Sequence, residues 1–486
     1  MIRAGGGGMN GVAGNSPGVG PVPRPASPPP VAPRGAALLL LWLLLGLPSA
    51  LLSQDDPLTR DWEEDWTDPA TSPALPTLED RLWDFDLVRG LRFRGPDGVP
   101  RLHGGGRLRL SAWERDPRSI QPRSELRLEK GALHLDGEAL DRIWLTIEAD
   151  LDGRDTRDGL RRAIFATRLH AFARLSVGLQ DPSIGIEGSL DPDRSIFSGP
   201  AFGPWLADRT DLGIRLDGEL LRGFLSYDLA YCAGEGFDLD GERIGEPRTS
   251  LRISLSPLTE SVLIPALTGP AAHLEGLFLT AGLALEEGFH RPLIVETPSR
   301  DRLFETVRID ADDARWWSYG WGVDGGDWRL THEWMRGTLE GVRTGGTRTD
   351  LRNQLRSMTA ILSWRLGGPS YDSHPFRQRP ARPFPAIDAP PTPPDTELPF
   401  ALPGPIELAI RYANGDLDRR LFELGLADDA VSSQEFRTIT AALGIEPAPF
   451  LRLSIEATRV IADQSPAAFD GHGRGTTIGF HAELRF

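Results

Sequence analysis

Residues 476–486 read T-T-I-G-F-H-A-E-L-R-F, and the sequence ends on the aromatic Phe486. In a β-strand, alternate side chains point to opposite faces, so the apolar and polar residues of this stretch would separate completely. An apolar outer face, a polar inner face and a terminal aromatic are typical of a strand that closes a transmembrane β-barrel. A soluble domain can also end on such a strand. The recurrence of the pattern and evidence of export therefore decide between the two.

The same alternation recurs along the chain. Many runs are about ten residues long and bounded by Gly, Asp or Pro, which is the length that a tilted strand needs to cross a bilayer. With weaker runs included, we count roughly sixteen, an even number as a closed antiparallel barrel requires. Clear examples are 107–113, 141–151, 173–180, 211–218, 221–232, 277–285, 316–323, 328–334, 358–366, 407–412, 438–445 and 451–457. The sequence thus predicts an all-β fold, a transmembrane antiparallel barrel of about sixteen strands.

Charged residues such as Arg142, Glu148 and Arg174 lie on the face opposite the apolar one, strand after strand. A soluble sandwich or barrel also alternates, with its charges outside and its apolar residues enclosed. Alternation alone does not say which face is enclosed. Export and the terminal aromatic favour the membrane barrel.

The first residues carry an export signal. Residues 1–34 are rich in Gly and Pro with three arginines, and an apolar run of twelve residues, 36–47, is followed by small residues. This order is typical of a secretory signal peptide, and the run is short for a spanning helix; an uncleaved anchor is the alternative. We expect a signal peptide over 1–53 with a long Gly/Pro-rich n-region, an acidic periplasmic linker over 54–99, and the barrel over 100–486. The expected location is the bacterial outer membrane.

Composition excludes several classes of protein. The formal net charge of −16 argues against nucleic acid as a partner. Cys232 is the only cysteine, so no internal disulfide framework can form. Lys130 is the only lysine, and nearly all positive charge is carried by arginine, whose fixed fork of donors suits phosphate and carboxylate groups.

Several stretches in order carry a resemblance: D-R-I-W-L-T-I-E-A-D-L at 141–151, R-L-S-V-G-L-Q-D-P-S-I at 174–184, R-T-D-L-G-I-R-L-D-G at 209–218, L-S-Y-D-L-A-Y-C-A-G-E-G at 225–236, G-P-I-E-L-A-I-R-Y at 404–412 and the run 438–460. Together they resemble the phosphate-selective porin O/P family of bacterial outer-membrane channels, from about residue 100 to the end. The resemblance implies a sixteen-stranded barrel, commonly a homotrimer, whose third extracellular loop folds inward as a constriction loop. The matching stretch is 184–208.

The expected pore is lined by charge at that constriction. The arginines we single out are Arg174, Arg194, Arg209 and Arg215, because they lie on or beside the predicted inward loop. The acidic residues in the same region are Glu187, Asp191, Asp193 and Asp208. This mixture departs from the lysine- and arginine-lined lumen of the family. Arginines paired with acids across neighbouring strands would instead stabilise the wall.

The sequence predicts an outer-membrane porin for passive diffusion of small hydrophilic solutes, including anions such as phosphate. Its expected partners are outer-membrane lipid, such solutes, two further copies of the chain, and the barrel-assembly machinery acting on the strand that ends at Phe486. The alternative is a secreted or surface β-protein that binds glycans through exposed tryptophans. An enzyme is a weaker third. The nine histidines show no catalytic or metal-ligand spacing, so we expect no catalytic residue, no metal and no cofactor.

Overall fold

The computed structural model describes sixteen strands that pair in sequence order and close into a ring. The chain divides into two units, Met1–Leu75 and Pro76–Phe486, and all described residues lie in the second. The described residues are 83–86, 90–94, 101–115, 124–139, 142–151, 159–170, 172–189, 195–207, 210–220, 224–234, 245–257, 276–344, 346–367, 404–448, 450–463 and 473–486. The predicted signal peptide, most of the predicted linker and most of the proline-rich stretch 367–405 lie outside them.

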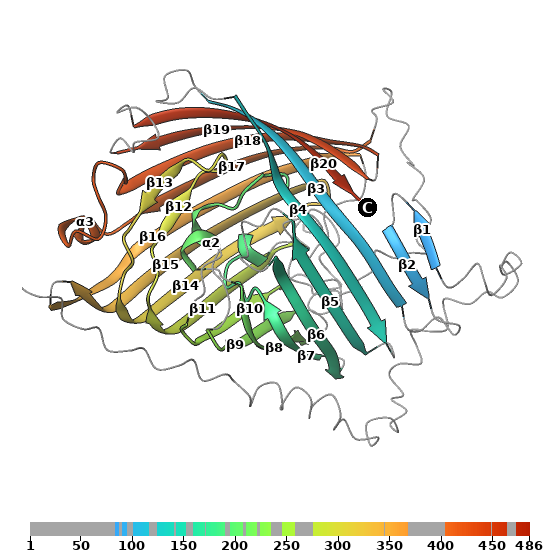
Figure 1. The fold of residues 1–486 in the computed structure, drawn as a ribbon, viewed down its shortest axis with the longest axis horizontal. Helices are drawn as coiled ribbons and strands as arrows, with labels where there is room; N and C mark the ends of the chain where they lie inside the picture. Colours follow the sequence, from blue (N-terminus) through green and yellow to red (C-terminus); the bar gives the residue numbers. More distant parts are fainter. Residues whose placement is uncertain are drawn as a thin grey trace, which may run out of the picture. The chain divides into compact units, whose positions relative to one another are not determined.

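Every neighbouring pair in the ring is antiparallel (Figure 1). The ring closes where the last strand pairs with the first, from Thr477 opposite Arg115 to Arg485 opposite Arg107. The strands are β3 (Arg101–Arg115), β4 (Ser124–Ala139), β5 (Ile143–Asp150), β6 (Leu160–His170), β7 (Ala173–Gln180), β8 (Asp211–Leu220), β9 (Leu225–Cys232), β10 (Arg248–Leu255), β11 (Phe278–Phe289), β14 (Ala311–Asp324), β15 (Trp328–Thr344), β16 (Thr347–Leu366), β17 (Ile406–Asp416), β18 (Glu435–Ala448), β19 (Leu451–Ala462) and β20 (Arg474–Arg485). The predicted all-β antiparallel barrel of about sixteen strands is confirmed.

The remaining elements are short. A hairpin of β1 (Trp83–Asp86) and β2 (Gly90–Arg94) extends the sheet, with β2 paired to the first residues of β3. These two strands lie within the stretch predicted as a linker. A second hairpin, β12 (Ile294–Glu296) and β13 (Arg302–Glu305), connects β11 to β14. Among the described residues, the helical pieces are η5 (Glu187–Ser189), α2 (Phe202–Ala207) and α3 (Arg419–Glu423).

The two ends of the barrel differ in their connections. At one end the chain turns within a few residues, at 140–142, 171–172, 221–224, 325–327 and 449–450, and the C-terminal Phe486 lies there as well. We call this the short-turn end, although two long connections, 256–277 and 367–405, also leave from it. The other end carries α3, the β12–β13 hairpin and the connection from β7 to β8. We call it the loop end.

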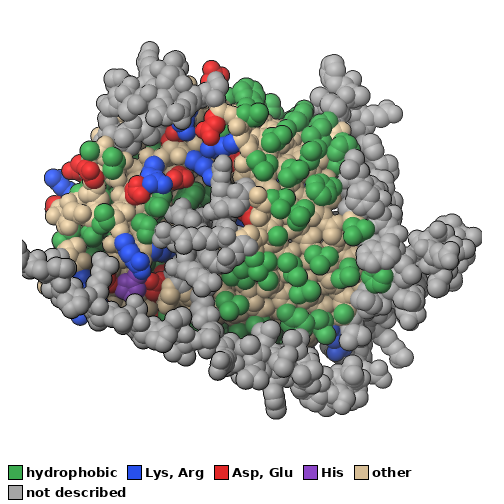
Figure 2. All heavy atoms as spheres, in the orientation of Figure 1, with side chains coloured by type: hydrophobic (Ala, Val, Ile, Leu, Met, Phe, Trp, Pro, Cys, Tyr) green, Lys and Arg blue, Asp and Glu red, His purple; other side chains and the backbone are tan. Residues whose placement is uncertain are grey.

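Exposure along β20 shows which face is enclosed. Phe480 is 52% exposed and Leu484 44% exposed, whereas Thr477 and Glu483, on the other face, are each 2% exposed. The same alternation runs through β10, β11 and β18. Figure 2 shows the resulting apolar surface, with hydrophobic side chains gathered over the front wall where Figure 1 places β3 to β6. The outer face is therefore apolar and the inner face polar, the reverse of a soluble barrel.

No helix among the described residues combines the length and the apolar character needed to cross a bilayer.

The apolar outer face leads to a position-dependent prediction. Ile410 is 54% exposed near the middle of β17, and Leu366 is 36% exposed at the end of β16. In lipid vesicles, Ile410→Arg should lower the free energy of unfolding by about 2–4 kcal/mol, and Leu366→Arg by only about 0–1 kcal/mol, because a charge costs most at the centre of the bilayer. Guanidinium titration of the two variants measures the difference. Equal losses at both positions would contradict the membrane-facing orientation of this surface.

Candidate functional site

The connection from β7 to β8 folds onto the inner face of the barrel. We call residues 181–207 the inner segment; the structure describes 181–189 and 195–207 of it, including η5 and α2 (Figure 1). Beyond Asp181, its polar contacts with the barrel strands are to buried side chains on β10, β15, β17 and β19, strands that do not neighbour β7. Since these side chains belong to the polar face, the segment crosses the interior from one wall to another. The predicted inward-folded loop is confirmed.

Glu333 on β15 holds the first part of the inner segment. Its carboxylate is buried and accepts hydrogen bonds from the backbone N–H groups of Ile186 at 2.9 Å and Glu187 at 3.2 Å. The Ser318 hydroxyl on β14 donates to the same carboxylate at 2.6 Å. A buried carboxylate is tolerated only when such donors replace water. Glu333 therefore fixes both the position and the backbone conformation of the segment at this point.

Arg411 on β17 joins the two arms of the inner segment. Its guanidinium donates to Oε1 of Glu187 at 2.8 Å and to the Gly199 carbonyl at 2.7 Å. The guanidinium carbon also lies 4.3 Å from the centre of the Phe197 ring, a cation–π contact. The same Glu187 oxygen accepts from the Ala201 N–H at 2.9 Å. This arrangement links residue 187 to residues 197–201 and both to the wall.

A third anchor lies on β19. The Glu456 carboxylate accepts from the N–H of Ser198 at 2.8 Å and from its hydroxyl at 2.9 Å. Arg452 donates to the Ser195 carbonyl at 3.2 Å and to Glu407 at 3.0 Å. On this wall, carboxylates accept from backbone N–H groups, and guanidinium groups donate to backbone carbonyls.

Arginines on or beside β10 hold the ends of the segment. Arg248 donates to the Ala207 carbonyl, and Arg252 donates to the Ser183 carbonyl at 3.4 Å. Arg291, just after β11, donates to the Leu206 carbonyl at 3.4 Å. The last two residues of α2 have no partner within a six-residue helix for their carbonyls, so these guanidinium groups supply the missing donors.

The underside of the segment is apolar and packs into the core of the barrel. Ile184, Phe202 and Leu206 belong to one buried cluster with Trp316 of β14 and Met335 of β15. Two glycines of the wall allow the close approach. A Cβ at Gly282 would lie 2.2 Å from the Ile184 carbonyl oxygen, and one at Gly320 would lie 2.6 Å from Cδ1 of Ile186. Apolar packing and buried hydrogen bonds together hold the segment in place.

Asp181 begins the inner segment and is tied to the neighbouring wall. It accepts from Arg162 at 3.2 Å and from the Thr210 hydroxyl. Burial alone would raise the pKa of Asp181, but the guanidinium groups of Arg162 and Arg161 and the Thr210 hydrogen bond together lower this pKa. The stability that ionised Asp181 contributes is therefore present above its ordinary pKa and is lost as the pH falls through the lowered value.

Three of the eight predicted site residues fall within the described residues. Arg174 and Arg215 lie on β7 and β8 and form ion pairs across the strands: Arg174 with Asp217 at 3.1 Å, and Arg215 with Asp228 at 2.6 Å. Glu187 is part of the inner segment and is paired with Arg411. The other five, Arg194, Arg209, Asp191, Asp193 and Asp208, lie outside the described residues.

The sequence did not reveal the anchors. The alternation along the strands places Glu333, Arg411 and Glu456 on the inner face. Alternation alone does not distinguish a charged residue that lines the lumen from one that binds the inner segment. Their partners come from positions more than 140 residues away in the sequence. The structure also brings His103, His134 and Asp136 together, although the histidines showed no metal-ligand spacing in the sequence.

No family model matches the chain, and no curated protein is similar to it. Among solved structures, the chain is similar to OmpT of Vibrio cholerae, an outer-membrane protein in a trimer form. The identity is 11%, the TM-score is 0.47, and 80% of this chain and 99% of that one are covered. It is also similar to the outer-membrane channel DcaP of Acinetobacter baumannii, with 12% identity, a TM-score of 0.46 and coverage of 81% and 99%. It is similar as well to Salmonella typhi OmpF in complex with daunomycin. The identity is 10%, the TM-score is 0.46, and 79% of this chain and 98% of that one are covered.

Removing the Glu333 carboxylate should release the inner segment. In Glu333→Ala, the amides of Ile186 and Glu187 lose their acceptor, and we expect their hydrogen exchange to become roughly tenfold faster, since a buried donor left without its acceptor costs about 1–3 kcal/mol. Hydrogen exchange with mass spectrometry on the folded barrel measures this.

Glu340→Ala is the matched control, because Glu340 lies on the same strand but pairs with Arg315 at an exposed position. In Glu340→Ala, the hydrogen-exchange rates of the Ile186 and Glu187 amides should equal those of the unmodified protein. Unchanged protection in Glu333→Ala would show that Glu333 does not hold the segment.

Proposed function

We propose that this protein is an outer-membrane pore for passive diffusion of small hydrophilic solutes, and that the inner segment forms its constriction. The observation that carries this proposal is the inner segment itself, which crosses the polar interior of a closed sixteen-strand barrel and is anchored to several strands of the opposite wall. A barrel of this strand number is wide enough for an aqueous lumen unless loops fill it. A segment fixed across the lumen narrows that space without depending on the outer loops.

The apolar outer face supports location in a membrane, and the expected signal peptide supports export, so the bacterial outer membrane is the compartment that fits both. Phospholipid and lipopolysaccharide acyl chains would cover the outer face. Assembly as a homotrimer and insertion by the barrel-assembly machinery through the strand ending at Phe486 belong to the same proposal. The resemblance to the phosphate-selective porin O/P family also belongs here.

The charged residues of the inner face that do not bind the inner segment favour anions. At the closing seam, Arg107, Arg109 and Arg485 lie around one carboxylate, that of Glu483, at 3.5, 2.5 and 2.6 Å. Arg485 also pairs with Glu446 at 3.4 Å, so three positive groups lie around two negative groups and leave a positive potential on this part of the wall.

A second group lies on β7 to β10. Arg174, Arg215 and Arg252 share the carboxylates of Asp217 and Asp228, at distances of 2.6 to 3.6 Å. On the opposite wall, by contrast, Glu333 and Glu456 accept hydrogen bonds from the inner segment and are removed from the lumen. We propose a preference for anions, with phosphate as one candidate, that arises from this unequal distribution of charge.

The glycan-binding alternative finds less support. Trp113, Trp144 and Trp316 are buried, so they offer no open face on which a sugar ring could stack. Trp364 is exposed, but it lies on the apolar outer face, opposite Trp328 and Leu408 of the neighbouring strands.

Single-channel recording in a planar bilayer with a salt gradient tests the proposal. We expect discrete open steps and a reversal potential of the sign that anion preference gives. In the double variant Arg174→Gln/Arg215→Gln, the carboxylates of Asp217 and Asp228 lose two of their three guanidinium partners, and the ratio of anion to cation permeability should fall roughly two- to fivefold at low salt, where screening is weak.

The control is Arg315→Gln, which removes the same charge from an exposed outer position. Its reversal potential should equal that of the unmodified protein. Open steps with the opposite sign would reject the anion preference while leaving the pore in place. A folded barrel that never conducts would reject the pore.

A further inference from the structure

A cluster of two histidines and one aspartate lies on the inner face at the short-turn end. His103 is on β3 and stands directly opposite Asp136 on β4, while His134, two residues earlier on β4, stands opposite Gly105. Residues two apart on one strand share a face, and directly opposed residues of neighbouring strands share it as well. His103 therefore shares the face of Arg107 and Arg109, which is the polar, enclosed one.

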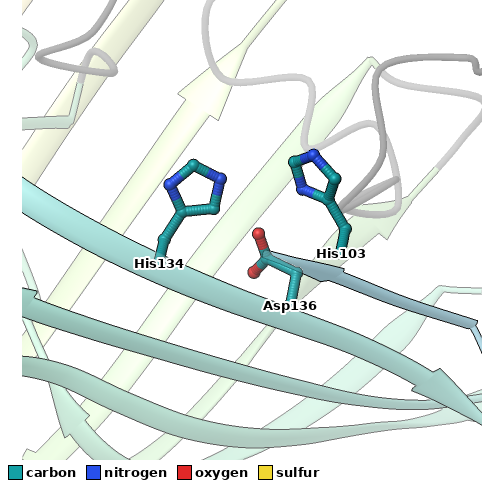
Figure 3. A group of neighbouring side chains, drawn as sticks. All are labelled: His103, His134 and Asp136. Atoms are coloured by element: carbon teal, nitrogen blue, oxygen red, sulfur yellow. The ribbon is translucent and has the colours of Figure 1, made fainter. Parts of the chain in front are cut away.

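The side chains of the cluster converge on one small space (Figure 3). One donor atom from each of His103, His134 and Asp136 lies within 4.8 Å of the other two. The imidazole centroids are 5.4 Å apart, and the ring planes are inclined by 44°, so the rings are not stacked face to face. In Figure 3 both rings rise on the same side of the sheet, with the Asp136 carboxylate between their bases.

Neighbouring groups hold this arrangement. A Cβ at Gly105 would lie 2.7 Å from atoms of the His134 ring and 2.4 Å from the carbonyl oxygen of Phe486, so only glycine leaves room for the ring beside the C-terminus. The Thr146 hydroxyl on β5 donates to Oδ1 of Asp136 at 2.8 Å. A hydrogen bond to one carboxylate oxygen orients the other, as the supporting groups around metal sites do.

The nearest charged side chains have partners of their own. Glu148, opposite His134 on β5, pairs with Arg161 at 3.2 Å, and Arg107 pairs with Glu483 at 3.5 Å. The cluster thus offers two imidazoles and one carboxylate beside an already paired set of charges.

We propose that His103, His134 and Asp136 bind a divalent transition-metal ion with the preferences of Zn²⁺. Two imidazoles and one carboxylate suit Zn²⁺ and its neighbours in the first transition row better than Mg²⁺ or Ca²⁺, which take mainly oxygen ligands. Metal–ligand bonds of about 2.0–2.1 Å place tetrahedral ligand atoms about 3.3 Å apart. Small rotations of the two rings and the carboxylate cover the difference from the present spacing. A fourth position would be left to water or a solute.

The bound ion would have two effects. It would link β3 to β4 beside the point where Phe486 exchanges backbone hydrogen bonds with Gly106, at 2.7 and 3.0 Å, and so stabilise the region where the barrel closes. It would also add positive charge to the lumen at the short-turn end. Neither effect depends on whether the barrel conducts solutes.

Binding of Zn²⁺ and Co²⁺ to the purified, chelator-washed barrel in detergent tests the proposal. The protein must carry no histidine tag. We expect one Zn²⁺ per chain by calorimetry, visible absorption bands of tetrahedral Co²⁺ with one equivalent, and an upward shift of the unfolding midpoint with Zn²⁺. Mg²⁺ at the same concentration should produce none of these.

Two variants locate the ion. Asp136→Asn keeps the oxygen that accepts from Thr146 but loses the charge, and His134→Ala removes one ring; each should weaken Zn²⁺ binding at least about tenfold and abolish the Co²⁺ bands. His170→Ala removes a histidine at the same end of the barrel but outside the cluster, and it should bind as the unmodified protein does. Heat-dependent migration on gels verifies that each variant is folded. The proposal is wrong if the unmodified barrel binds no Zn²⁺, or if folded Asp136→Asn and His134→Ala bind it with undiminished affinity.

Discussion

The structure depends on the pairing of β20 with β3, which leaves the sixteen-strand ring without a free edge. A sheet in contact with lipid must satisfy every backbone N–H and C=O group internally, and closure is the only way for strands to do so. Once the ring is closed, a side-chain period of two assigns every residue to an inner or an outer face. The apolar residues of β20 then face outward, and Thr477, His481 and Glu483 face inward. The polar interior is a consequence of that assignment.

A polar interior also explains how the inner segment can be held. Its backbone lies away from any sheet, so its N–H and C=O groups need other partners. The wall supplies them from buried ionisable side chains: Glu333 and Glu456 accept from N–H groups, and Arg248 and Arg411 donate to carbonyls. Hydrogen bonds with one charged partner are stronger than neutral ones, and the buried charges are in turn stabilised by the segment. Wall and segment are therefore mutually dependent, whereas Arg109 of β3, Arg174 of β7, Arg215 of β8 and Arg485 of β20 form ion pairs with acids of the wall.

Much of the fold could be predicted, because strands whose apolar and polar residues alternate without interruption can be recognised in the sequence. The predicted strand 173–180 coincides with β7, and the number of barrel strands is correct. β6 is not among the clear alternating runs, because Arg161 and Arg162 are consecutive and are followed by four consecutive apolar residues, 163–166, which breaks the alternation. In β4, a bulge between residues 128 and 130 shifts the alternation by one residue. Even-numbered residues before the bulge face outward, and those after it, including His134 and Asp136, face inward.

The sites were less predictable, since they are made by contacts between distant parts of the chain. Glu333 meets Ile186 across 147 positions, and Ser198 meets Glu456 across 258. His103 joins His134 and Asp136 only through the register of β3 and β4, which the sequence does not state. The alternation along each strand predicts the face on which a charged residue lies. Whether that residue lines the lumen or anchors the inner segment depends on contacts that only the three-dimensional structure shows.

The central claim is that one residue step along a strand changes the surroundings from lipid to the enclosed polar face. Spin labels at Phe480→Cys and His481→Cys, each in a Cys232→Ser background and reconstituted in lipid vesicles, test it most directly. The label at 480 should be strongly relaxed by oxygen, which concentrates in lipid, and weakly by a water-soluble nickel chelate. The label at 481 should show the opposite preference. Equal accessibility to the chelate at both positions, or the reverse order, would contradict the account.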